Sequence, residues 1–179
     1  MSSPNQVTGF RPELTRELYA DDPGNLIPFI QAAYGEAYQA DTVEKYLYTS
    51  RLIVLRNKAA ELAGAAVIDK HRIVMTAPSV DREKFGSRMA LKLRLLQQSR
   101  EDGRARWATV GLNYPKVEGV YRQSGMQRVN NLTYAQSLIN QIDTTDIPVF
   151  EYGEDGLVTI SGPSAAQPGY RQMILAWSQ

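Results

Sequence analysis

Residues 81–91, with the sequence DREKFGSRMAL, place charged side chains and one glycine directly ahead of an expected amphipathic helix. The N-terminus of a helix presents unpaired N–H groups and a partial positive charge, and Gly86 would let the backbone approach a ligand closely. The positive side chains of the stretch are Arg82, Lys84 and Arg88. Together these features predict a phosphate-binding turn. Asp81 and Glu83 also suit a helix start that holds no ligand, so a simple capped helix stays an alternative.

A second stretch, residues 113–126, carries a candidate proton donor. Tyr121 lies four residues before Gly125, on the last turns of an expected short helix. Its hydroxyl can both donate and accept a hydrogen bond, which suits a general acid. The alternative is a half-buried aromatic between helix and sheet, because the chain has 10 tyrosines.

The first stretch is expected to connect a strand to a helix. Three short apolar runs with tight connections predict an antiparallel meander: 51–56, 62–68 and 72–76. Ala77 and Pro78 are expected to end the third strand. A single helix is then expected over 85–101, followed by Gly103 as its stop. The buried face of this helix should be formed by Met89, Leu93 and Leu96.

The remaining pattern indicates the fold class. Before the meander we expect a strand within 10–18, a helix from Leu26 and a short helix from Asp41. After the long helix we expect a strand over 106–112, a helix over 115–123, a strand over 127–135, a hairpin over 150–160 and a final strand over 170–177. This order predicts an α+β, layered fold with a mixed, mostly antiparallel sheet flanked by helices. Residues 1–139 should form one domain, and 140–179 a β-rich extension that packs on it or on a partner.

Composition limits the kinds of protein this can be. The chain has 179 residues, 43% of them hydrophobic, and can bury a core. Its net charge of +1 gives no global attraction to nucleic acid or to an anionic membrane, so neither partner is expected. The absence of cysteine and the single histidine, His71, argue against a metal site. No apolar run spans a bilayer and no signal peptide is visible, so we expect a cytoplasmic protein.

The two stretches together resemble the GNAT superfamily of acetyl-CoA-dependent N-acyltransferases, over about residues 10–135. The central motif of that family follows a strand, reads Gln/Arg-x-x-Gly-x-Gly/Ala and opens a helix. Asp81, Lys84 and Gly86 fall on its three fixed positions, where Gly86 matches, and Arg82 would match the first after a one-residue insertion. The later motif of the family is an asparagine, a short helix and Tyr-x-x-x-Gly-Phe. It corresponds here to Asn113, Tyr121, Gly125 and Met126, with one extra residue before the tyrosine.

The resemblance implies an enzyme in which an amine, from a small molecule or a protein, directly attacks the thioester of acetyl-CoA or another acyl-CoA. The fourth and fifth strands would splay to admit the pantetheine arm. The arm would pair with main-chain groups of Val74, Met75 and Thr76. The pyrophosphate would be held by amides of Arg82, Lys84, Phe85, Gly86, Ser87 and Arg88. Asn113 would contact the cosubstrate near its sulfur, and Tyr121 would protonate the departing thiolate.

Departures from the family pattern keep other functions open. Lys84 stands where a glycine is expected, and its Cβ could obstruct a phosphate, although its ammonium could bind one. A non-catalytic GNAT-like protein is the main alternative, with 140–179 used for assembly, as in a homo-oligomer. A nucleic-acid-modifying enzyme would need a basic face, formed by Arg82, Lys84, Arg88, Lys92, Arg104 and Arg106. The general base is not identified among Asp69, His71 and Glu83, which all lie near expected strand ends.

Overall fold

The computed structural model describes residues 11–14, 26–34, 44, 47, 50–142, 147–161 and 171–178. The chain divides into two compact units, Met1–Ala105 and Arg106–Gln179. The short helix expected from Asp41 lies mostly outside the described residues, where Glu44 and Leu47 alone are described and both are helical.

The first unit is built on antiparallel strands. Its described strands, in spatial order, are β1 (Arg11–Leu14), β2 (Arg51–Arg56), β3 (Leu62–Asp69) and β4 (Arg72–Pro78). The predicted meander is confirmed, because runs of branched residues bounded by turns favour adjacent antiparallel strands. The predicted end of the third strand is wrong, since Pro78 still pairs with Gly64. The fixed φ of proline is compatible with extended backbone at a strand end.

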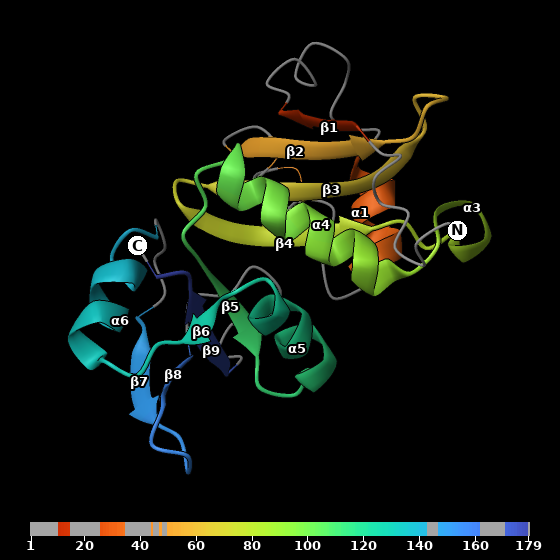
Figure 1. Ribbon diagram of the computed structural model, residues 1–179. Coiled ribbons are helices and arrows are strands. Elements are labelled where there is room, and N and C mark those ends of the chain that lie inside the picture. Colours follow the sequence, from red (N-terminus) through yellow and green to blue (C-terminus); the bar gives the residue numbers. More distant parts are fainter. Residues whose placement is uncertain are drawn as a thin grey trace. The chain divides into compact units, whose positions relative to one another are not determined.

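Helices cover both faces of this sheet (Figure 1). Leu26 and Ile30 of α1 (Leu26–Tyr34) pack against one face, in a cluster with Leu52, Val67 and Met75. The opposite face carries α4 (Arg88–Glu101), which packs so closely that a Cβ on Gly64 would lie 3.1 Å from Leu95 Cδ1. Side chains alternate between the two faces along each strand, so both faces carry apolar side chains, and each face is covered by a different helix.

The helix expected over 85–101 is confirmed as α4, with the predicted end at Glu101, but it begins three residues later than expected, at Arg88. A short helix that we did not expect, α3 (Arg82–Phe85), precedes it. Gly86 interrupts them with φ 80° and ψ −150°, a conformation that side-chain-bearing residues rarely adopt. Asp81 caps α3 and Ser87 caps α4, each through a side-chain oxygen that accepts a backbone N–H. The sequence therefore contains two helix starts where we expected one.

The buried face of α4 also differs from the prediction. Met89 is 42% exposed and Leu93 is half-buried, whereas Leu96 is buried as expected. The buried residues of the helix are Leu91, Lys92, Leu95, Leu96, Gln98 and Ser99. Gly103 ends the helical region as predicted, and a Cβ there would lie 2.3 Å from Ile68 Cδ1. Only Leu96 is common to the predicted and the observed buried face.

The second unit also contains antiparallel strands. Its described strands are β5 (Trp107–Gly111), β9 (Gln172–Ala176), β8 (Val158–Ser161) and β7 (Val149–Tyr152) in spatial order, with β6 (Gln127–Arg128) also paired to β9. The hairpin, the final strand and α5 (Pro115–Gln123) are confirmed. Residues of the predicted extension thus pair with β5 and β6, which precede it in the chain. The domain boundary at residue 139 stays a prediction.

The strand expected over 127–135 is wrong beyond Arg128. The chain instead forms α6 (Leu132–Ile139), because the Asn131 side chain accepts the Tyr134 N–H at 2.9 Å and caps a new helix. Ala135, Leu138 and Ile139 of this helix join a core with Trp107, Val129, Val158, Ile160, Ile174 and Ala176. In Figure 1, α5 and α6 lie on opposite sides of the strands of this unit. The predicted α+β class, with mostly antiparallel strands flanked by helices, is confirmed.

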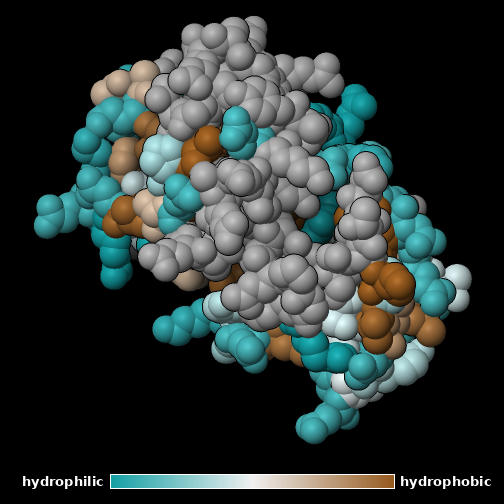
Figure 2. All heavy atoms as spheres, turned by 180° about the vertical axis from the view of Figure 1, so that it is seen from behind, coloured by the Kyte–Doolittle hydropathy of each residue, from teal (hydrophilic) through white to brown (hydrophobic). Residues whose placement is uncertain are grey.

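Apolar side chains are exposed along β7. Ile147 is 84% exposed, Val149 48% and Tyr152 60%. Viewed from behind, hydrophobic surface is visible at the lower right of the molecule (Figure 2). Among the described residues, no helix combines the length and the apolar character that crossing a membrane requires.

Candidate active site

Most N–H groups just before the turn between α3 and α4 are already hydrogen-bonded within α3. The Asp81 carboxylate accepts the Lys84 N–H at 3.0 Å, and the Asp81 carbonyl accepts the Phe85 N–H at 3.0 Å. The Gly86 N–H donates to the Arg82 carbonyl at 2.9 Å. The N–H groups of Lys84, Phe85 and Gly86 therefore already have acceptors inside this short helix.

The N-terminus of α4 is the part of the turn that can offer donors to a ligand. Ser87 Oγ accepts the Ala90 N–H at 3.3 Å. Helix geometry leaves the N–H groups of Arg88 and Met89 without an intrahelical acceptor. Gly86 and Ser87 are exposed beside them, and Gly86 has no side chain to cover them. The arrangement can bind an anion through these N–H groups and the positive end of the helix dipole.

The side chain of Arg88 connects this turn to α1. Arg88 Nη2 donates to the carbonyl of Ala33, in the last turn of α1, at 2.9 Å. A cation at a helix C-terminus interacts favourably with the helix dipole. The main chain of Arg88 therefore lies at the predicted turn, whereas its guanidinium is hydrogen-bonded to the C-terminal end of α1.

Lys84 makes an ion pair that the sequence did not predict. Its ammonium contacts the Glu61 carboxylate, which lies 23 residues earlier, just ahead of β3. Asn57 Nδ2 donates to the other oxygen of Glu61 at 3.1 Å. The hydrogen bond from Lys84, and then that from Asn57, lowers the pKa of Glu61, and the same bond to Glu61 raises the pKa of Lys84. Any phosphate that binds this ammonium must share it with Glu61.

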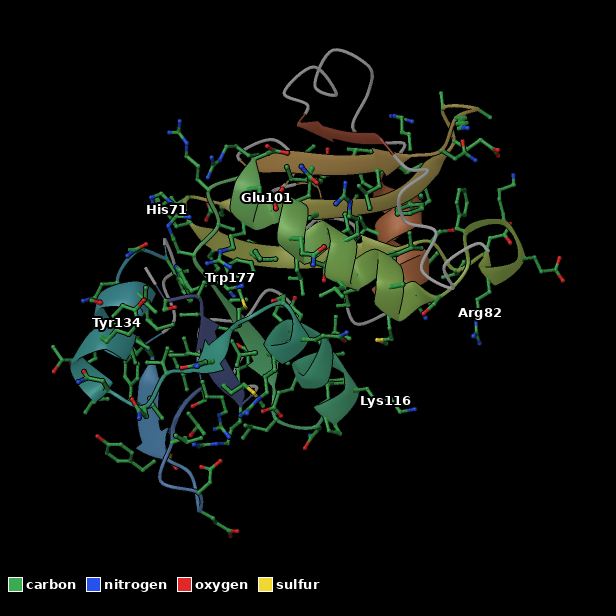
Figure 3. All side chains as sticks on the ribbon, in the orientation of Figure 1. His71, Arg82, Glu101, Lys116, Tyr134 and Trp177 are labelled. Atoms are coloured by element: carbon green, nitrogen blue, oxygen red, sulfur yellow. The ribbon has the colours of Figure 1, made fainter. Side chains whose placement is uncertain are left out.

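The side chains of Phe85 and Arg82, also on α3, face different surroundings. Phe85 is half-buried, and the Lys84 Nζ lies 5.9 Å from the centre of its ring. Arg82 is exposed and projects away from the strands of the unit (Figure 3). Arg82 is therefore accessible to an anion in solution.

The predicted pantetheine-binding residues lie on β4. Val74 is half-buried, and Met75 and Thr76 are buried. The carbonyl of Thr76 accepts a hydrogen bond at 3.2 Å from Nζ of Lys92, a residue of α4 that is 7% exposed. Sequence reasoning placed Lys92 on a conceivable basic surface, whereas the structure buries it. Lys92 lies three residues before Leu95 and seven before Ser99, the spacing of one helix face, and this spacing is the signal that could have shown its burial.

Asn113 and Tyr121 belong to the second unit. Asn113 is exposed, two residues beyond the end of β5. Tyr121 is 5% exposed on α5, and its carbonyl accepts hydrogen bonds from Ser124 Oγ at 2.5 Å and from the Met126 N–H at 3.3 Å. These bonds close the C-terminus of α5 around Tyr121.

The candidate general bases of the first unit lie in two places, because Asp69 ends β3 beside the turn that holds His71, whereas Glu83 belongs to α3. Glu83 lies on α3 and is exposed. His71 is exposed in the turn between β3 and β4, with Nδ1 3.0 Å from the Arg104 carbonyl. Figure 3 shows His71 and Arg82 at opposite ends of this unit. Within the residues that the structure describes, no group of three or more His, Asp or Glu side chains could hold a metal ion.

Replacing Glu61 by glutamine should lower the melting temperature slightly at neutral pH. The lowered pKa of Glu61 stabilises the fold above the ordinary glutamate pKa of about 4.3, and this contribution is lost as pH falls through the lowered value. The raised pKa of Lys84 stabilises the fold below the ordinary lysine value and is lost as pH rises through the raised one.

Thermal unfolding across the pH range tests this contribution. The difference between wild type and Glu61→Gln should be largest near neutrality and vanish in strong acid. Glu154→Gln, at an exposed carboxylate of the β7–β8 hairpin, is the control and should show no such profile. A Glu61→Gln difference that persists unchanged in acid would contradict the ion pair.

Solved structures of three acetyltransferases are similar to this chain over nearly all of its length. The Bacillus subtilis acetyltransferase in complex with CoA has a TM-score of 0.54 and 18% identity, covering 95% of this chain and 99% of that one. The ribosomal-protein-S18-alanine N-acetyltransferase of Escherichia coli has a TM-score of 0.54 and 13% identity, covering 94% and 92%. A Vibrio cholerae spermidine N-acetyltransferase chimera has a TM-score of 0.51 and 11% identity, covering 94% and 95%.

No family model matches the chain, and no curated protein sequence does. The structural likeness confirms a GNAT-like fold, as the resemblance of the two sequence stretches predicted.

Proposed function

We propose that this protein is an acetyl-CoA-dependent N-acetyltransferase that transfers an acyl group to a primary amine. The observation that carries the proposal is the interruption at Gly86, which exposes the N-terminus of α4 directly after β4 and α3. A helix N-terminus beside a glycine suits a pyrophosphate. This unit occurs in a chain whose fold is that of acetyltransferases, one of which was solved in complex with CoA.

In this proposal the cosubstrate is acetyl-CoA or another acyl-CoA. The pyrophosphate would be held by the N–H groups of Ser87, Arg88 and Met89 at the start of α4, with Arg82 and Lys84 adding positive charge. The pantetheine arm would pair with main-chain groups of β4 at Val74, Met75 and Thr76, as an added strand does. Asn113 would contact the cosubstrate near its sulfur.

The proposed reaction is direct transfer. The lone pair of a neutral amine attacks the thioester carbonyl carbon, and the tetrahedral species collapses with cleavage of the C–S bond. Tyr121 donates its hydroxyl proton to the departing thiolate, the attacking nitrogen gives up its extra proton to solvent, and the tyrosinate then takes a proton back from solvent. The hydroxyl suits this step because it is a donor on a buried helix side chain.

The acceptor is expected to be a small-molecule or protein amine. Two of the similar proteins are named for such groups, one for spermidine and one for the alanine of ribosomal protein S18. These two amines are therefore the first to try.

Calorimetry with acetyl-CoA, followed by an assay for thiol release, tests the proposed function. We expect saturable binding, and release of CoA thiol when spermidine or a peptide that begins with alanine is added. No heat and no thermal shift at millimolar acetyl-CoA would overturn the proposal.

A non-catalytic role in assembly is the alternative, and the exposed apolar residues at β7 favour it. Ile147, Val149 and Tyr152 are exposed at a strand whose one described partner is β8. An edge strand with apolar side chains suits pairing with another chain, such as a second copy. Failure to bind acetyl-CoA would favour this alternative.

A further inference from the structure

The carboxylate of Glu61 is held in place by the turn between β2 and β3. Asn57 Nδ2 donates to Glu61 Oε1 at 3.1 Å, and Asn57 Oδ1 accepts the N–H groups of Ala59 at 3.0 Å and of Glu61 at 2.9 Å. Arg56 adds a bond across the same turn, from Nη1 to the carbonyl of Ala60 at 3.0 Å. An asparagine that bonds the backbone two residues on fixes such a turn, so Glu61 presents its other oxygen, Oε2, from a defined position.

The ammonium of Lys84 contacts this Oε2 atom from α3, the helix directly before the proposed pyrophosphate turn. The side chains of Lys84 and Glu61 are 46% and 43% exposed, so a solute in water can reach both of them. No residue of α3 is fully buried, so this short helix has little packing to hold it. Ion pairs between exposed side chains are weak, and a competing anion can therefore take the ammonium.

A pyrophosphate at the turn would be such an anion. Lys84 lies two residues before Gly86 and three before Ser87, the N-cap of α4. A pyrophosphate carries more than one negative charge and several acceptor oxygens, so it offers the ammonium more than a single carboxylate does. Glu61 opposes its binding in two ways, because the carboxylate occupies the ammonium and adds a negative charge of its own.

We propose that Glu61 sets the affinity for acetyl-CoA by competing with its pyrophosphate for the Lys84 ammonium, an inference that rests on the proposed function. In the free protein the ammonium binds Glu61 and holds α3 against the β2–β3 turn. When the pyrophosphate binds, the ammonium passes to a phosphate oxygen, and Glu61 keeps its bond from Asn57. Lys84 thus binds phosphate at the position where a glycine was expected, and Glu61 makes that binding weaker.

Calorimetry of acetyl-CoA binding to Glu61→Gln at low salt tests this competition, because glutamine keeps an oxygen that Asn57 can bond and removes the charge. We expect Kd for acetyl-CoA to fall about twofold to fivefold, the range set by one exposed ion pair. The gain should shrink at high salt, which screens exposed charges. The melting temperature of the free variant should fall at the same time, as predicted above. A purely structural role of Glu61 would instead weaken the fold and the binding together.

Two further variants separate competition for the ammonium from a general effect of charge. Glu83→Gln removes the same charge from an exposed position of α3 itself, beside Lys84, and should change Kd for acetyl-CoA less than Glu61→Gln does. Lys84→Met should raise Kd by itself. In that background the addition of Glu61→Gln should bring no further gain like that seen in wild type, because the group that the two anions share is gone.

The outcomes divide between this inference and the proposed function. An unchanged or higher Kd in Glu61→Gln would overturn the inference and leave the proposed function standing. Equal gains in Glu61→Gln and Glu83→Gln, or a full gain in the Lys84→Met background, would also overturn it. Wild type that binds no acetyl-CoA would instead overturn the proposed function, and this inference with it.

Discussion

Replacing Tyr121 by phenylalanine should lower kcat about a hundredfold to ten-thousandfold, the usual contribution of a positioned general acid. The change removes one hydroxyl and keeps the aromatic ring, which is buried on α5. Packing and the N–H groups proposed to bind pyrophosphate stay as they are. Affinity for acetyl-CoA should therefore remain at the wild-type value, and the loss should appear in the chemical step.

Steady-state kinetics together with calorimetry separate these two quantities. Tyr134→Phe is the control, because Tyr134 is an exposed tyrosine of α6 that has no proposed role. It should leave kcat unchanged. An unaltered kcat in Tyr121→Phe would remove the proton-donor role, whereas a matching loss of acetyl-CoA affinity would make Tyr121 a binding residue.

Replacing Gly86 by alanine should weaken both the fold and the binding of CoA. At φ 80° and ψ −150°, a side chain costs about 1–3 kcal/mol in free energy of unfolding. The cause is strain in the backbone itself, because no atom lies within 4 Å of a Cβ built at this position. If the turn relaxes, the first N–H groups of α4 move, and affinity for CoA should fall about tenfold for each 1.4 kcal/mol of binding free energy lost.

Gly156→Ala provides the matched control for this prediction. Gly156 also has a positive φ, 75°, and open space around its Cβ position, but it lies in the β7–β8 hairpin of the second unit. Thermal unfolding should show a loss of stability in both variants. Calorimetry should show weaker CoA binding for Gly86→Ala alone. Equal CoA affinities in the two variants would show that the α3–α4 turn does not hold the pyrophosphate.

Local signals in the sequence were sufficient for most elements. The strands of the meander, the hairpin at β7 and β8, and α5 with its proline at the first position were all predicted, because turn residues and short-range periodicity act over a few residues. These local signals gave a wrong prediction after Arg128, where a strand pattern and a helix-capping residue occur together. The apolar residues after Arg128 suited a strand, but Asn131 capped a helix over Leu132–Ile139.

The sequence by itself determined the α+β class, the order of most elements and the glycine that precedes a helix. Only the tertiary structure decided which helix face is buried, that Lys84 pairs with Glu61, and that Arg88 reaches Ala33 across 55 residues. The reason is physical. Caps and turns depend on residues that are close in the sequence. These contacts instead join residues far apart in the sequence, and they depend on how the sheet and the helices pack.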